Sequence, residues 1–131
     1  VTYMPMLMGT GGNSGSQSAT LVIRGMALDE IELSDAFRVL WKEIRISTII
    51  GISLSALNFA RIYWFDGQSA LIAMTVSVIV IAAKSIGSML PMIAKRVGID
   101  PALVASPMIS SLTDMVSVVT YFLLATAILN L

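Results

Sequence analysis

Long apolar segments dominate this sequence and restrict the folds that it can adopt. An α-helix needs about 20 apolar residues to cross the hydrocarbon core of a bilayer. Four stretches approach this length, and they are residues 1–27, 44–60, 69–94 and 102–131. Charged side chains make up only 12% of the chain, about half the share of a typical soluble domain. We therefore predict an all-α integral membrane protein, built as a multi-span helical bundle.

The basic residues predict how this bundle is oriented. Residues 28–43, between the first two spans, form a charged interfacial linker, and Trp41 within it is typical of residues at the lipid headgroups. Basic side chains gather in or beside this linker and in the third loop, at Arg24, Arg38, Lys42, Arg45, Lys95 and Arg96. The middle loop carries Arg61 alone. The positive-inside rule then places the linker and the third loop in the cytoplasm of a multi-pass cell (inner) membrane protein, with both ends of this sequence outside.

The sequence begins inside a hydrophobic segment, without an initiator methionine, a basic leader or a cleavage site. We interpret residues 1–131 as one transmembrane domain taken from a longer chain. Further helices or a soluble domain would then precede Val1.

The available donor atoms limit the metal ions that the chain can bind. Cysteine and histidine are both absent, which excludes sites built on thiolate or imidazole ligands. Oxygen ligands remain, and they favour hard cations such as magnesium or calcium. The nine methionines are interpreted as flexible packing. A net charge of zero argues against nucleic acid as a partner and leaves membrane lipid as the surroundings.

Asp114 is the most informative residue, because it lies near the middle of the last predicted span. A carboxylate at the bilayer centre costs about 2.5–3.5 kcal/mol on insertion scales and usually faces a bundle interior or a water-filled cavity. One interpretation is an ion site; the other is a neutral acid hydrogen-bonded to a neighbouring helix. Polar side chains recur around it at helical spacing, namely Ser106, Ser110, Thr113, Ser117 and Tyr121. This stripe favours the wall of a hydrated pore.

The first predicted span carries a second polar stripe, in the run from Gly9 to Gln17. Its glycines suit close helix packing, and they also suit local unwinding that frees carbonyl oxygens for an ion. The two interpretations are compatible. The candidates for lining a pore in this run are Thr10, Gly12, Asn13, Ser14 and Gln17.

A single carboxylate is too little for a dehydrated divalent cation, but magnesium keeps several of its waters in protein sites. Two copies of Asp114 across a two-fold axis would match the double charge of the ion. We therefore predict a homodimer, with the pore at its interface and lined by the first and last spans. Lys84, inside the third span, has three candidate partners: Asp114, a lipid phosphate, or a polar group on a neighbouring helix. A further alternative is that its side chain snorkels to the membrane surface.

Two motifs at opposite ends of the chain resemble the MgtE family of magnesium transporters. One is PMLMGTGGNSGSQ followed by SATLVIRGMA, from Pro5 to Ala27. The other combines the run 98–102, Ser106 with Pro107, and Asp114. The resemblance covers nearly the whole chain. It implies a homodimer of five-helix subunits, of which this sequence holds the second to fifth helices, preceded by a cytoplasmic magnesium-sensing domain.

The resemblance also implies a central ion site formed by Asp114 and Asn13. Ser106 stands where some members have asparagine, and its hydroxyl would meet a hydrated ion. The expected cargo is Mg²⁺, with Mn²⁺, Co²⁺ and Ca²⁺ as alternatives.

Two other functions remain open for the same residues. A coupled carrier could exchange Na⁺ or H⁺ for a divalent cation and would also use Asp114. An intramembrane aspartyl protease would need a second acidic group sharing a proton at close range. Because we place every acidic residue except Asp114 in a loop, we do not expect an enzyme.

Overall fold

The computed structural model describes residues 2–64, 69–105 and 107–130. These residues form α1 (Met4–Ala27), a 3₁₀ turn (Leu33–Asp35), α2 (Ala36–Tyr63), α3 (Ser69–Arg96), α4 (Pro101–Ala105) and α5 (Pro107–Leu129). No strand occurs within these three ranges. The prediction of an all-α helical bundle is confirmed.

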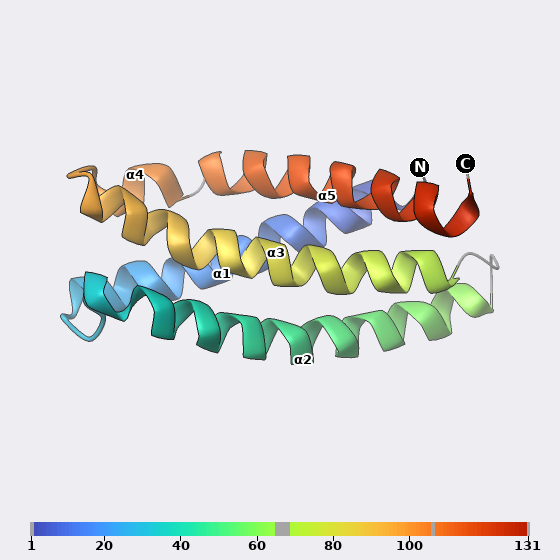
Figure 1. The fold of residues 1–131 in the computed structure, drawn as a ribbon, viewed down its shortest axis with the longest axis horizontal. Coiled ribbons are helices and arrows are strands. Elements are labelled where there is room, and N and C mark those ends of the chain that lie inside the picture. Colours follow the sequence, from blue (N-terminus) through green and yellow to red (C-terminus); the bar gives the residue numbers. More distant parts are fainter. Residues whose placement is uncertain (1, 65–68, 106, 131) are drawn as a thin grey trace.

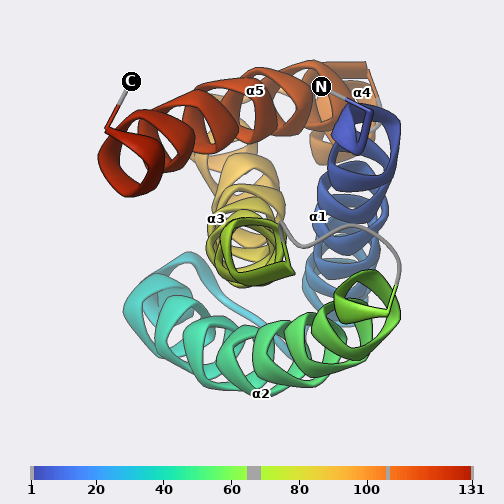
Figure 2. The same ribbon diagram turned by 90° about the vertical axis from the view of Figure 1, so that its right-hand side faces the viewer.

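The four long helices run side by side, and α3 lies at the centre of the arrangement. Figure 2 shows α5, α1 and α2 arranged as a C around α3. α1 also packs against α5, whereas α1 and α2 both pack on α3 rather than along each other. The linker from α1 to α2 and the connection from α3 to α4 lie at one end of the bundle (Figure 1), as the predicted topology requires.

In the part of the chain that the structure describes, three helical segments are long and apolar enough to cross a membrane, and they are Leu33–Tyr63, Ala70–Arg96 and Pro101–Leu129. α1 has 24 residues, which is also sufficient length. Its run of glycine, serine, asparagine and glutamine makes it less apolar than the other three. That α1 spans the membrane as well remains a prediction.

α2 begins earlier than the span predicted from residue 44. Its first turns, from Ala36 onward, occupy part of the region 28–43 that was assigned to an interfacial linker. Ala36 and Val39 pack against a small core formed by Val22, Met26 and Met92. Burial of this apolar face holds the first turns of α2 against the bundle.

The glycines of α1 allow its backbone to approach α3 very closely. A Cβ atom added to Gly87 of α3 would lie 2.1 Å from the carbonyl oxygen of Gly15 in α1. α1 is an unbroken helix from Met4 to Ala27. Of the two interpretations of the glycine run, close packing is the one that this structure shows.

Gly87→Ala is expected to destabilise the bundle strongly. Real Cβ atoms almost never come within 3.0 Å of a neighbouring heavy atom, so α1 and α3 must separate. Overpacking of this kind typically costs about 1–3 kcal/mol. The melting temperature of the purified protein in detergent measures the effect. Gly9→Ala is the matched control, since nothing lies within 4 Å of a Cβ atom there, and equal melting temperatures for the two variants would contradict the close contact.

Candidate ion site on helices α1 and α5

One face of α5 is buried against α1 and α3, and its residues recur every fourth position: Ile109, Thr113, Ser117, Tyr121 and Ala125. The Thr113 hydroxyl donates to the carbonyl oxygen of Ile109 at 2.8 Å. The Ser117 hydroxyl donates to the carbonyl oxygen of Thr113 at 2.7 Å. The hydroxyls of Thr113 and Ser117, which were predicted to line a pore, therefore form hydrogen bonds within α5. Their side chains contribute to helix packing.

Small residues of α1 receive these side chains of α5. A Cβ atom on Gly11 would lie 2.9 Å from the Ser117 Oγ, and one on Gly12 would lie 4.0 Å from the Thr113 Oγ1. Asn13 and Asp114 are the next residues along the two helices. The contact therefore brings the turn that carries Asn13 level with the turn that carries Asp114.

The Asp114 side chain lies at the edge of this helix contact and is half-buried. Within the described ranges, no residue gives its carboxylate a hydrogen bond or an ion pair. Ser110, one turn earlier on the same side of α5, is half-buried as well. The carboxylate is thus available to a group outside this chain, such as an ion, water or a second subunit.

α1 presents an open polar face beside this region. Asn13, Gln17 and Thr20 are exposed, and together with Ser16 and Leu21 they line a shallow groove. The Thr10 hydroxyl is half-buried and donates to the carbonyl oxygen of Met6 at 2.8 Å. Of the residues of α1 that were predicted to line a pore, Asn13 and Gln17 therefore line this groove.

Ser14, another predicted site residue, is buried and does not line the groove. Ser106 lies outside the described residues. Elsewhere in the described chain, no group of three or more acidic side chains is placed to hold a metal ion. The donors that remain on α1 and α5 are one carboxylate, amide oxygens and hydroxyls, a set that suits a cation retaining much of its water.

A buried polar cluster joins α1, α2 and α3. The Glu43 Oε2 accepts a hydrogen bond of 2.7 Å from the Ser18 hydroxyl and lies 3.7 Å from the Lys84 Nζ. Lys84 also donates to the Ser18 Oγ at 3.2 Å. Glu43 is 6% exposed, Lys84 4% and Ser18 0%. Each charge therefore has a partner inside the bundle.

This cluster corrects the prediction that Asp114 is the sole acidic residue outside loops, because Glu43 lies within α2. It also decides between the three partners proposed for Lys84: the partner is a polar group on neighbouring helices, neither Asp114 nor a lipid phosphate. A signal for Glu43 was present in the sequence. The residue continues the spacing of Ala36 and Val39, and Ser47 follows it on the same buried face.

Comparison with known proteins identifies the kind of protein to which these helices belong. The MgtE family, described as "Divalent cation transporter", matches residues 4–124. The "Magnesium transporter MgtE" of Thermus thermophilus is 40% identical over 131 residues, which is 98% of this chain and 29% of that protein. The protein of the same name in Bacillus subtilis is 33% identical over 132 residues, covering 98% and 29%.

A third relative of the same name, from Enterococcus faecalis, is 28% identical over 132 residues, covering 94% and 28%. The chain thus spans less than a third of the length of these relatives. The family match places it among transporters rather than enzymes. With three helical segments able to cross a bilayer, the chain belongs to the MgtE family of divalent cation transporters and is part of a multi-pass membrane protein.

Proposed function

We propose that this chain is the membrane-embedded part of a magnesium-selective channel that moves Mg²⁺ into the cytoplasm. The pore is lined by α1 and α5, and a hydrated ion is held by Asp114 with Asn13 nearby. The observation that carries this proposal is the half-buried Asp114 carboxylate. It lies level with the Asn13 turn and has no partner among the described residues. The relatives are named magnesium transporters, which supports Mg²⁺ as the cargo over Mn²⁺, Co²⁺ or Ca²⁺.

The functional unit is a homodimer in this proposal. Each chain supplies one carboxylate, and a two-fold axis beside Asp114 brings two of them to one ion, matching its charge. The groove of Asn13 and Gln17 would then face the second subunit or the pore water. Backbone carbonyls and amide oxygens can contact the ion through its water shell, because Mg²⁺ loses water reluctantly.

The orientation in the membrane follows from charge at the two ends of the bundle. The end that carries the α1–α2 linker and the α3–α4 connection also carries Arg38, Lys42, Lys95 and Arg96. Cytoplasmic ends of membrane helices are enriched in such residues. We place this end in the cytoplasm, where a magnesium-sensing domain of the whole protein would gate the pore.

Asn13→Ala is the direct test of the α1 side of the pore. The full-length protein should support uptake of Mg²⁺ in cells that lack their own magnesium transport. The variant should reduce uptake about tenfold, or admit other divalent cations, because one hydrogen bond to the charged ion's water shell is lost.

Ser53→Ala is the control for Asn13→Ala, since Ser53 is exposed on α2 and its hydroxyl bonds the carbonyl oxygen of Ile49 at 2.9 Å. This change should leave uptake unaltered. Uptake and selectivity in Asn13→Ala equal to those of Ser53→Ala would contradict the assignment of α1 to the pore.

A further inference from the structure

A cavity of about 560 Å³ separates α1 from α2 at the end of the bundle that carries their linker. It exists because both helices pack on α3 instead of on each other. The linker closes one side of it. The backbone N–H groups of Glu30 and Ile31 donate to the carbonyl oxygen of Gly25 at 2.9 and 3.1 Å. The Ile31 side chain packs so closely on Gly25 that a Cβ atom there would lie 2.5 Å from its Cδ1. The cavity is therefore framed by an anchored loop.

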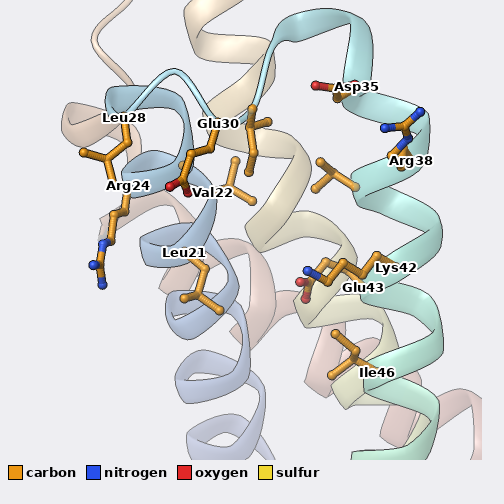
Figure 3. Close-up of a pocket in the computed structure, with 13 residues that line it drawn as sticks. Leu21, Val22, Arg24, Leu28, Glu30, Asp35, Arg38, Lys42, Glu43 and Ile46 are labelled. Atoms are coloured by element: carbon orange, nitrogen blue, oxygen red, sulfur yellow. The ribbon is translucent and has the colours of Figure 1, made fainter.

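Three basic side chains line this cavity, and they are Arg24 on α1, and Arg38 and Lys42 on α2. In Figure 3, Lys42 extends from α2 toward α1, whereas Arg24 lies on the side of α1 that faces away from α2. All three are exposed. None of them forms a hydrogen bond or an ion pair with another residue in the described ranges. Such cations are available to an anionic ligand.

The acidic residues of the cavity leave this positive charge uncompensated. Glu43 is already paired with Lys84, and the Asp35 carboxylate accepts the backbone N–H of Glu32 at 3.1 Å. When Glu43 and Lys84, which does not line the cavity, are counted as a neutral pair, the other lining residues carry three positive charges and two negative charges, so one positive charge remains. The cavity therefore complements a ligand group that carries a single negative charge, such as a phosphodiester.

The rest of the lining is apolar and suits hydrocarbon. It comprises Leu21, Val22, Leu28, Val39 and Ile46. Leu21 is 60% exposed and Leu28 56%, so apolar surface stands next to the basic side chains without being covered by this chain. An amphipathic ligand would contact both surfaces at once.

Exposed aromatic residues place the cavity at the depth of lipid headgroups. Phe37 is 80% exposed and Trp41 56%. They lie in the same turns of α2 as Arg38 and Lys42. Aromatic side chains of this kind gather where the bilayer meets water, so the three cations lie at the level of the phosphates of the adjoining leaflet.

We propose that this cavity binds one anionic phospholipid, with the phosphate beside Arg38 and Lys42 of α2 and an acyl chain along Leu21 and Ile46. Basic pockets between membrane helices on the cytoplasmic side are suited to anionic headgroups. The site shares Leu21 with the groove on α1, but neither Asn13 nor Asp114 lines it. It depends on the chain lying in a membrane and not on the transported ion.

Binding is tested on the full-length protein in detergent by titrating phosphatidylglycerol and following its retention by native mass spectrometry. The wild type should retain phosphatidylglycerol in preference to phosphatidylcholine. The double variant Arg38→Gln/Lys42→Gln should bind phosphatidylglycerol about tenfold more weakly or worse, because two charges near the headgroup are lost. The matched control is Lys95→Gln/Arg96→Gln, which removes the same charge from exposed positions at the same end of the bundle.

Three results would overturn the proposal. Equal retention of phosphatidylcholine would show that charge does not select the lipid. An equal loss in the control variant would show general attraction to a basic surface. Competition by inorganic phosphate at the same concentration as the lipid would show an anion site in which the apolar wall has no part. The wild-type preference, together with a loss confined to the cavity variant, supports the assignment.

Discussion

Asp114→Ala is expected to abolish magnesium uptake by the full-length protein while leaving its insertion and folding intact. In the proposed dimer this one change removes both carboxylates from the ion site. At a separation of about 5 Å and an effective dielectric constant of about 20, each carboxylate attracts a unit charge by roughly 3 kcal/mol. A loss of uptake of about a hundredfold or more is therefore expected. Folding should be spared, because no described residue bonds the Asp114 carboxylate.

Uptake of magnesium in cells that depend on the protein measures this effect, and the amount of protein in the membrane is determined in parallel. Asp100→Asn is the control, since it removes a carboxylate from the α3–α4 connection, where Asp100 accepts the backbone N–H of Ala102 at 3.0 Å. Uptake by Asp114→Ala at the wild-type level would remove the basis of the proposed pore. Single-channel currents in the wild type would support a channel, whereas flux that depends on Na⁺ or H⁺ would indicate a coupled carrier.

Local patterns predicted the helices and their turns because these depend on neighbouring residues. The apolar runs indicated the long helices. Gly98, which follows the end of α3, has φ of +81°, a backbone conformation that glycine adopts without steric cost. The Asp100 carboxylate accepts the backbone N–H of Ala102, as an aspartate at the start of a helix commonly does. α2 begins at Ala36, so its first turns belong to the predicted interfacial linker and precede the span predicted from residue 44.

The residue types of the candidate ion site were visible in the sequence, but their division between open and buried faces was not. Asn13 and Ser14 are adjacent in sequence, yet Asn13 is exposed and Ser14 is buried. The helical rotation of about 100° per residue separates them. Thr113 and Ser117 illustrate a second difficulty. Hydroxyls that bond their own helix pack against neighbouring helices as readily as they line water, so only the three-dimensional arrangement decides.

The buried pair of Glu43 and Lys84 could not be predicted from the sequence, because it too depends on the three-dimensional arrangement of the helices. The two residues lie on different helices, and their meeting depends on how α2 packs on α3. Each charge alone is compatible with a membrane helix. Glu43 falls in the predicted linker at the membrane surface, and the long side chain of Lys84 can extend toward that surface. Ser18 completes the cluster from α1, the helix that also carries Asn13.

Lys84→Met is expected to destabilise the protein strongly, because it leaves the Glu43 carboxylate buried without its counter-charge. Removing one partner of a buried ion pair typically costs about 3–5 kcal/mol. Glu43→Gln alone should also destabilise the protein, since it leaves the Lys84 ammonium buried without a counter-charge. The double variant Glu43→Gln/Lys84→Met should recover most of the loss, because no buried charge is unpaired and the amide oxygen still accepts the Ser18 hydroxyl.

Melting temperatures of the four proteins in detergent form a double-mutant cycle that isolates the interaction between the two charges. Lys95→Met, at an exposed position near the end of the same helix, controls for the loss of a lysine from α3. Strictly additive effects of the two single changes would show that the pair contributes nothing to stability. A strongly non-additive cycle would mean that the two charges are tolerated in the bundle only together. The hydrogen bonds of Ser18, which tie α1 to this pair, would then depend on Glu43 of α2 and Lys84 of α3.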